Sequence, residues 1–219
     1  MQENYHSIFD IIGPVMVGPS SSHTAGAAAL GNVAKNIFRQ APQSITIDYY
    51  ESFAQTHRGH GTDFAIVGGC LGISEADPRI ATSLELAKQQ GISIEFREHS
   101  CPSPIGHPNT AMINLIRDGY RAKIGGCSIG GGKVEVREIS FDQHDLLLPG
   151  QLPLCILVCS VKDFESCLAL LTGAGIRIDS KNFCEFDGPL NLYVLNIQTI
   201  PRQATRNKLE KYCIKFICV

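Results

Sequence analysis

The chain contains no pair of cysteines in CxxC spacing, although nine of its 219 residues are cysteine. Zinc ribbons and ferredoxin-type clusters use such close pairs, because neighbouring thiolates must converge on one metal. Several of the nine cysteines lie in apolar, periodic segments, where a thiol behaves as a small hydrophobe. We therefore expect most of them to be buried, reduced and structural, and we expect no metal ligand in this chain.

Blocks of basic residues are also absent. Nineteen basic and twenty-one acidic residues give a formal net charge of −2, so phosphate-driven binding of nucleic acid has no electrostatic basis. No apolar run approaches the roughly 20 residues that cross a bilayer, and the first residues lack the basic and apolar regions of a signal peptide. We therefore expect a cytoplasmic protein that binds neither nucleic acid nor a membrane.

Hydrophobic periodicity divides the chain into helices and strands, with a boundary near 146–153. That segment contains two prolines and a glycine, which are typical of a connection between domains. We therefore expect one domain over 1–147 and a second over 148–219. In the first domain, the patterns predict helices over 6–12, 24–38, 62–71, 79–90 and 109–117, and strands over 44–50, 92–97, 120–129 and 133–139.

The second domain is predicted to have six elements in the order βαββαβ. They are expected over 154–160, 163–171, 176–183, 190–198, 201–212 and 215–219. This order is the split βαβ, or ferredoxin-like, arrangement, which at this length is typical of small regulatory ACT modules. The expected fold class is therefore α+β, a mixed α/β domain followed by a ferredoxin-like domain.

A run of hydroxyl side chains surrounds a histidine where the predicted helix over 24–38 begins. The segment Gly18-Pro-Ser-Ser-Ser-His-Thr-Ala-Gly26 contains Ser20, Ser21, Ser22, His23 and Thr24. A helix N-terminus presents unpaired N–H groups and a positive dipole end, which suit a carboxylate or a phosphate. One serine is enough for the simpler interpretation, a helix cap. The number of hydroxyls favours an anion or substrate site, with Gly18 and Gly26 allowing the backbone to approach the ligand.

His60 lies between two glycines in Thr56-His-Arg-Gly-His-Gly-Thr-Asp63, just before the helix predicted over 62–71. Glycine neighbours indicate an imidazole that another group must approach. An ordinary pKa of about 6.5 makes imidazole a natural general base near neutral pH. The alternative is a flexible turn in which Asp63 caps the helix and His60 is merely exposed.

Two further segments are polar: one lies at the start of the helix predicted over 109–117, and the other lies in the turn predicted between two strands. In His107-Pro-Asn-Thr110, a plain cap by Asn109 or Thr110 is the favoured interpretation. Ser128-Ile-Gly-Gly-Gly-Lys133 presents consecutive backbone amides that could form an anion nest. Its spacing is that of neither a P-loop nor a dinucleotide motif, and a tight turn needs no ligand.

Taken together, these segments resemble one enzyme family. They are Ser7-Ile-Phe-Asp-Ile-Ile-Gly-Pro14, Gly18-Pro-Ser-Ser-Ser-His-Thr-Ala-Gly26, Gly59-His-Gly-Thr-Asp63, His107-Pro-Asn-Thr110 and Ser128-Ile-Gly-Gly-Gly132. In this order the chain resembles the beta chain of bacterial iron–sulfur-dependent L-serine dehydratase, also called L-serine deaminase. The ACT-like tail extends the resemblance to nearly the full chain, as in the two-chain form of that enzyme.

The resemblance implies an activity, a cofactor and partners. The reaction is the conversion of L-serine to pyruvate and ammonia with a [4Fe–4S] cluster and without pyridoxal phosphate. The family's cluster cysteines lie in the alpha chain, so the active site would form where an alpha chain meets this one. The tail would then serve self-association or docking. Its Ser160-Val-Lys-Asp-Phe164 lacks the glycine that amino-acid-binding ACT modules have at this point.

The resemblance also implies roles for single residues. His60 is the first candidate for proton transfer and His23 the second. The substrate would be held by Ser20, Ser21, Ser22, Thr24, Asp63, Asn109, Gly130, Gly131 and Gly132. The first domain is also similar to the effector domain of some D-3-phosphoglycerate dehydrogenases. The alternative is therefore that these groups sense serine and regulate the alpha chain without taking part in the chemistry.

Overall fold

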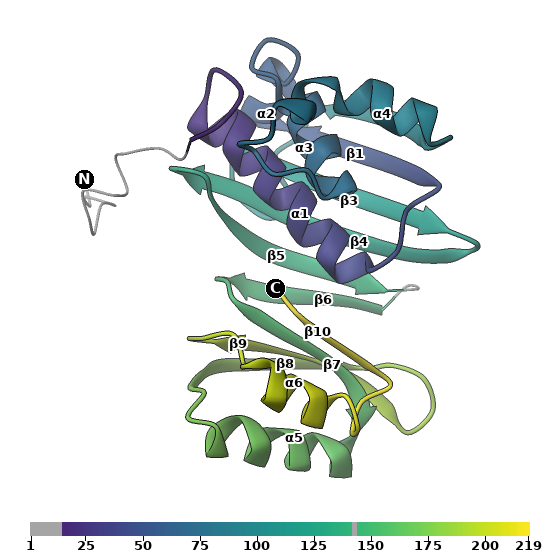
Figure 1. The fold of residues 1–219 in the computed structure, drawn as a ribbon, viewed down its shortest axis with the longest axis vertical. Coiled ribbons are helices and arrows are strands. Elements are labelled where there is room, and N and C mark those ends of the chain that lie inside the picture. Colours follow the sequence, from purple (N-terminus) through teal and green to yellow (C-terminus); the bar gives the residue numbers. More distant parts are fainter. Residues whose placement is uncertain (1–14, 142–143) are drawn as a thin grey trace.

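The computed structural model describes residues 15–141 and 144–219, and the helix expected over 6–12 lies outside them. The fold is α+β and contains two sheets, one of six strands and one of four (Figure 1). Among the described residues, no helix combines the length and the apolar character needed to cross a membrane.

The six-stranded sheet has the strand order β2-β1-β3-β4-β5-β6. Its strands are β1 (Ser44–Tyr50), β2 (Ser93–His99), β3 (Thr110–Arg117), β4 (Tyr120–Gly130), β5 (Lys133–Phe141) and β6 (His144–Gly150). β1 and β2 are parallel, and the other pairs are antiparallel. The strands predicted over 44–50, 92–97, 120–129 and 133–139 are confirmed, and β4 and β5 form the expected hairpin.

Helices cover one face of this sheet. They are α1 (Gly26–Phe38), α2 (Glu51–Thr56), α3 (Thr62–Leu71) and α4 (Ser83–Gln89), with a short 3₁₀ turn, η3 (Pro78–Thr82), before α4. The helix predicted over 79–90 is therefore divided into η3 and α4. Ile45, Ile47 and Tyr49 of β1 are fully buried beneath the helices, whereas the alternate residues of β1 lie on the open face. Alternation of this kind is typical of a sheet that is covered on one side.

Two glycines let α1 and α3 cross at backbone contact. A Cβ atom at Gly31 would lie 2.1 Å from the carbonyl oxygen of Ile66, and one at Gly69 would lie 2.2 Å from that of Ala28. No larger residue fits at either position without moving a helix. This close crossing fixes how the beginnings of the two helices lie relative to each other.

The helix predicted over 109–117 is wrong, because this segment is the strand β3. β3 lies inside the sheet, paired with β1 on one side and β4 on the other. Ala111, Ile113 and Leu115 face the helices and are fully buried. The cap interpretation of Asn109 and Thr110 fails for the same reason, since no helix follows them.

The interpretation of 146–153 as a connection alone is also wrong, because most of it belongs to β6. Leu146 and Leu148 are buried while Leu147 is 72% exposed, which is the alternation of a strand. Pro149 is tolerated because β6 lies at the edge of its sheet and pairs with β5 alone. The division at residue 147 remains a prediction, although β6 runs through that position.

The βαββαβ order predicted after this strand is confirmed. The elements are β7 (Leu154–Ser160), α5 (Val161–Gly173), β8 (Ile178–Glu185), β9 (Leu190–Ile197), α6 (Gln203–Leu209) and β10 (Lys215–Cys218). They form an antiparallel sheet with the order β10-β7-β9-β8. Assignment to the ACT modules remains a prediction.

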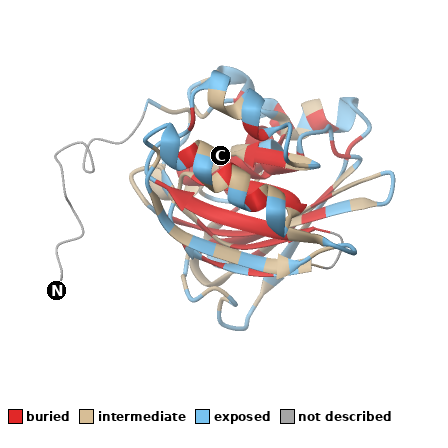
Figure 2. Ribbon diagram, turned by 90° about the horizontal axis from the view of Figure 1, so that it is seen from below, coloured by how far each residue is buried: buried red, intermediate tan, exposed pale blue. Residues whose placement is uncertain are grey.

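The two sheets share one hydrophobic core. Ile156, Val194 and Ile217 of the four-stranded sheet belong to the same buried cluster as α1 and the six-stranded sheet. The Arg39 guanidinium, at the end of α1, donates to the carbonyl of Phe216 in β10 at 2.7 Å. β7 is buried over nearly its whole length, whereas β2 and β8 contain no buried residue. Figure 2 shows this burial along the ribbon, with buried, intermediate and exposed residues in different colours.

Candidate functional site

His23 and His60 lie face to edge at the beginnings of two neighbouring helices. Their ring centroids are 4.8 Å apart, with an interplanar angle of 75°. His23 belongs to the turn that leads into α1, and His60 to the loop that leads into α3. The structure therefore brings together the two histidines that the sequence singled out.

The hydroxyl segment forms a single π-helical turn, η2 (Ser21–Ala25), which continues directly into α1. The helical region thus begins before Thr24, the residue at which it was predicted to begin. The Ser20 hydroxyl accepts from the backbone N–H of His23 at 3.2 Å and caps this turn. The capping interpretation is confirmed for Ser20, but it leaves the other hydroxyls to be explained.

Hydroxyl groups contact both ring nitrogens of His23. Ser22 Oγ lies 2.9 Å from Nδ1, and Ser52 Oγ, at the start of α2, lies 3.3 Å from Nε2. Burial lowers the pKa of His23 below its ordinary 6.5, and the neighbouring His60 lowers it further. His23 is therefore a neutral imidazole at pH 7, able to accept a proton.

The lowered pKa of His23 can be measured directly. In an NMR titration of the histidine ring protons, we expect the His23 midpoint below 6.5 and expect it to rise in His60→Ala, which removes the neighbouring imidazole. The unfolded chain binds the proton more readily, so this histidine makes the free energy of unfolding fall as the pH drops below 6.5. A His23 midpoint at or above 6.5 would contradict the prediction.

His60 is fixed through its backbone and not through its ring. Its carbonyl accepts from the Thr24 hydroxyl at 2.9 Å, which ties the loop before α3 to η2. Its Nδ1 atom is buried, and within residues 15–141 and 144–219 it has no hydrogen-bond partner. Buried polar atoms in native proteins nearly always have a partner. His60 thus has unused hydrogen-bonding capacity next to a neutral imidazole.

The end of β4, which contains Ser128, packs against the start of α1 next to the histidine pair. Ser128 Oγ is buried and likewise has no partner among the described residues. It lies against Gly26, where a Cβ atom would be 2.1 Å from that oxygen. Asn109 joins it through its side-chain amide, which donates to the Ser128 carbonyl at 3.4 Å.

The two glycines of the hydroxyl segment have a packing role within the chain. A Cβ atom at Gly18, whose φ is +143°, would lie 2.3 Å from Thr24 Cγ2. Gly26 makes room for Ser128. Both glycines permit close packing within the chain, and the expectation that they let the backbone approach a ligand remains a prediction.

Asp63 is held inside the chain by a residue that the sequence analysis did not single out. His57, which is 3% exposed, places Nδ1 2.7 Å from the Asp63 carboxylate and Nε2 2.9 Å from that of Glu98. Contact between Asp63 and a substrate remains a prediction. The only signal for His57 was its place in the same segment as His60, whereas nothing marked Ser52.

Gly130, Gly131 and Gly132 form the turn between β4 and β5. All three have positive φ angles, +100°, +61° and +77°, which other residues rarely adopt. The turn explains the three glycines without a ligand, and the anion nest remains a prediction.

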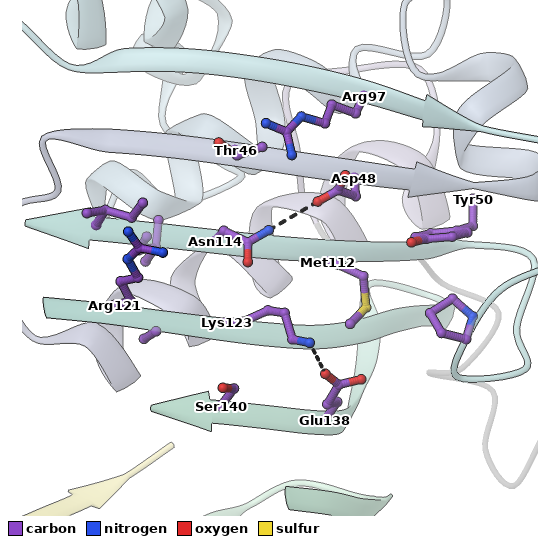
Figure 3. A pocket seen from close by; sticks show the side chains of 14 residues that line it. Thr46, Asp48, Tyr50, Arg97, Met112, Asn114, Arg121, Lys123, Glu138 and Ser140 are labelled. Atoms are coloured by element: carbon purple, nitrogen blue, oxygen red, sulfur yellow. Dashed lines mark hydrogen bonds and ion pairs between the residues drawn. The ribbon is translucent and has the colours of Figure 1, made fainter. Parts of the chain in front are cut away.

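A separate hollow of about 670 Å³ lies on the open face of the six-stranded sheet (Figure 3). None of the predicted site residues lines it. Several of its polar groups are paired: Asn114 donates to Asp48 at 3.1 Å, and Lys123 forms an ion pair with Glu138. His99 also contacts Asp48, at 2.7 Å. The site of His23 and His60 offers unused polar atoms and is the stronger candidate.

A family model described as "Serine dehydratase beta chain" matches residues 7–138. The chain is similar to "Probable L-serine dehydratase, beta chain" of Bacillus subtilis, with 48% identity over 155 residues, 70% of this chain and 68% of that protein. It is similar to "L-serine dehydratase, beta chain" of Peptoniphilus asaccharolyticus, with 43% identity over 136 residues, 62% and 61% of the two chains. "L-serine dehydratase" of Haemophilus influenzae is 42% identical over 72 residues, 30% of this chain and 15% of that protein.

Proposed function

The chain belongs to the serine dehydratase beta-chain family, and we propose that it is the subunit that completes the active site of a two-chain L-serine dehydratase. The words "beta chain" in the names of two relatives support a second, alpha chain as its partner. The proposed reaction is the conversion of L-serine to pyruvate and ammonia.

One observation carries this proposal. The buried Nδ1 of His60 lacks a partner among the described residues, and it lies beside the neutral ring of His23 and a turn rich in hydroxyls. Such a group suits a small, polar molecule that the chain itself does not supply. A serine molecule has a carboxylate, an ammonium group and a hydroxyl to satisfy these atoms.

The reaction needs a base that removes the α-proton of serine and a group that helps the β-hydroxyl to leave. An imidazole removes the α-proton of serine, and the β-hydroxyl leaves as water, which gives 2-aminoacrylate. This tautomerises to an imine, and one water molecule hydrolyses the imine to pyruvate and ammonia. In our proposal His60 is the base, and His23 holds or relays the proton. Ser21, Ser22 and Thr24 orient the substrate together with Asn109.

The [4Fe–4S] cluster belongs to the alpha chain in this proposal. When bound, it supplies an iron that polarises the serine hydroxyl as a Lewis acid. The donors around His23 and His60 are imidazole, hydroxyl and amide groups, which fit a substrate better than a cluster. The one cluster of three cysteines in the described part of the chain lies elsewhere, among β7, α5 and the segment before β10.

The partner requirement can be tested by co-expression with a cysteine-bearing alpha chain under anaerobic conditions. We expect the two chains to co-purify as a brown complex and serine turnover to require both. Turnover by the alpha chain alone at the rate of the complex would contradict the proposal.

The alternative function is serine sensing. It is favoured by the capped turn at the start of α1, because backbone N–H groups and hydroxyls there can bind a carboxylate without any chemistry. In that case this chain would regulate the alpha chain, and self-association through the four-stranded sheet would transmit the signal.

Ser21→Ala distinguishes the two functions. Within the described residues, Ser21 supports the turn through its backbone carbonyl, which accepts from Gly26. If the hydroxyl binds substrate for catalysis, its loss should raise KM by roughly 5–10-fold, the equivalent of about 1 kcal/mol, and leave the curve hyperbolic. If it senses serine, the variant should change the sigmoidal activation while the maximal rate persists. Ser93→Ala, at the exposed start of β2, is the matched control and should alter neither.

A further inference from the structure

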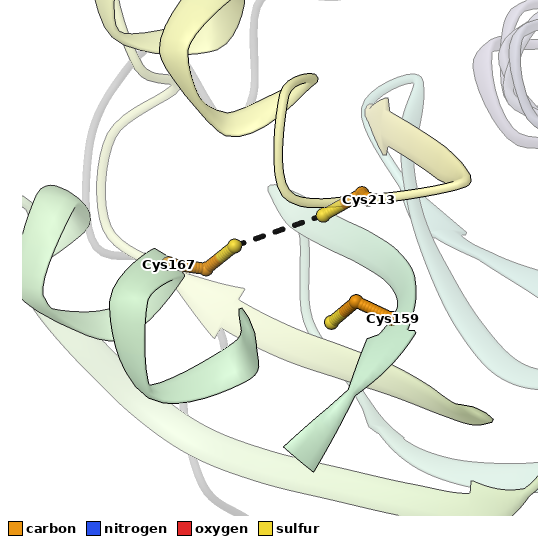
Figure 4. Close-up of side chains that lie close together, drawn as sticks. All are labelled: Cys159, Cys167 and Cys213. Atoms are coloured by element: carbon orange, nitrogen blue, oxygen red, sulfur yellow. Dashed lines mark hydrogen bonds between the residues drawn. The ribbon is translucent and has the colours of Figure 1, made fainter. Parts of the chain in front are cut away.

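Three cysteines converge where α5 packs on the four-stranded sheet, away from the histidine pair. Cys159 lies near the end of β7, Cys167 lies in α5, and Cys213 precedes β10. Their Sγ atoms all lie within 4.8 Å of one another, and those of Cys167 and Cys213 are 3.7 Å apart. The thiols of Cys167 and Cys213 point toward each other, and Cys159 lies beside this pair (Figure 4).

The 3.7 Å between the Sγ atoms of Cys167 and Cys213 corresponds to two ligands of a single ion, and Cys159 Sγ lies within 4.8 Å of both. A metal–sulfur distance of about 2.3 Å places two ligand sulfurs about 3.8 Å apart in a tetrahedron and about 4.0 Å apart in a trigonal plane. A disulfide would need about 2.05 Å. A [4Fe–4S] cluster binds each cysteine to a different iron, which spreads the sulfurs wider than the ligands of one ion.

We propose that Cys159, Cys167 and Cys213 bind one thiophilic cation, either Zn²⁺ or Cu⁺. Three soft thiolates without an imidazole or carboxylate in the set select these ions over Mg²⁺, Ca²⁺ or Mn²⁺. Cu⁺ is satisfied by three thiolates, whereas Zn²⁺ takes a fourth ligand from solvent. Cys159 and Cys167 are buried and Cys213 is half-buried, which leaves one side for entry.

Binding would join three parts of the chain that lie far apart in sequence. Each thiol loses its proton as a metal–sulfur bond forms, so up to three protons are released for each ion bound. The ion links the end of β7, the middle of α5 and the residues before β10. Because folding creates this set of ligands, binding should stabilise the folded chain.

The test uses the full-length chain, reduced, metal-free and kept anaerobic. It is dialysed against Zn²⁺ in one experiment and against Cu⁺ in another, and bound metal is counted by mass spectrometry. We expect one ion per chain, near-ultraviolet thiolate-to-metal absorption and a higher Tm. The experiment in which the tighter binding occurs identifies the ion. Cys213→Ser should weaken binding by more than about 100-fold, since loss of even an outer-shell partner costs roughly 10–100-fold.

A second thiol contact in the same sheet provides the matched control. Cys218 of β10 lies opposite Cys155 of β7. Cys218→Ser removes one half-buried thiol outside the proposed site and should leave binding unchanged. Circular dichroism must show each variant to be folded, and Cys167→Ala replaces Cys213→Ser if that variant is not.

Two results would overturn the proposal. One is that the wild-type chain binds no more of either ion than a variant in which all three cysteines are serine. The other is that Cys218→Ser loses as much binding as Cys213→Ser. Neither result bears on serine turnover, which is assayed at the other site.

Discussion

His60→Ala should lower kcat for serine by roughly 10²–10⁴-fold, the usual effect of removing a general base. The side chain makes no hydrogen bond through Nδ1 to the described residues, whereas its backbone carbonyl, which alanine retains, holds Thr24. The loss should therefore be confined to the chemistry, with subunit assembly and Tm little changed. The measurement is anaerobic steady-state kinetics of the complex with its alpha chain.

Two further readouts separate a base from a residue that only shapes the site. Serine deuterated at the α-carbon should show a larger isotope effect on kcat in His60→Ala, because proton removal becomes slower. Added imidazole should restore part of the rate. His144→Ala is the matched control. His144 lies at the start of β6, where its ring contacts the Phe141 carbonyl and the Phe186 ring, and its loss should leave kcat unchanged. A His60→Ala variant that keeps more than half of the wild-type turnover would exclude His60 as the base.

The sequence predicted those parts of the fold whose signals are local. β1 alternates apolar and polar residues, and the glycines after β4 mark the hairpin, so both could be recognised in a single segment. β3 could not, because it is apolar on both faces. Met112 and Ile113 point to opposite sides and both are buried, so the run satisfies a helical spacing as well as a strand alternation. Its neighbours β1 and β4 decide the conformation.

The candidate site could be predicted only in part, for a similar reason. His23 and His60 each lie in a conspicuous segment, but their contact depends on how α1 and α3 cross. Ser52 and Ser128 join the site through the packing of α2 and β4. The three thiols show the limit most clearly, since Cys167 and Cys213 are separated by 46 positions and meet only because β10 returns beside β7. Local spacing cannot reveal such a group.

The crossing of α1 and α3 is the feature on which the site depends most, and Gly69→Ala should disturb it strongly. The added methyl would lie 2.2 Å from the Ala28 carbonyl oxygen and 2.7 Å from the Asn32 nitrogen, both backbone atoms that cannot rotate away. We expect the free energy of unfolding to fall by about 3 kcal/mol, at the upper end of the usual cost of overpacking. Urea denaturation monitored by circular dichroism measures this change.

The same substitution should also reduce turnover, because α1 begins next to His23 and α3 begins next to His60. A shift that relieves the clash must separate the two helices and therefore the two rings. Gly173→Ala is the matched control: it lies at the end of α5 with no atom within 4 Å of the added carbon, and alanine is the better helix former there by up to about 1 kcal/mol. If both variants were equally stable and equally active, the close crossing would not be what holds the histidines together.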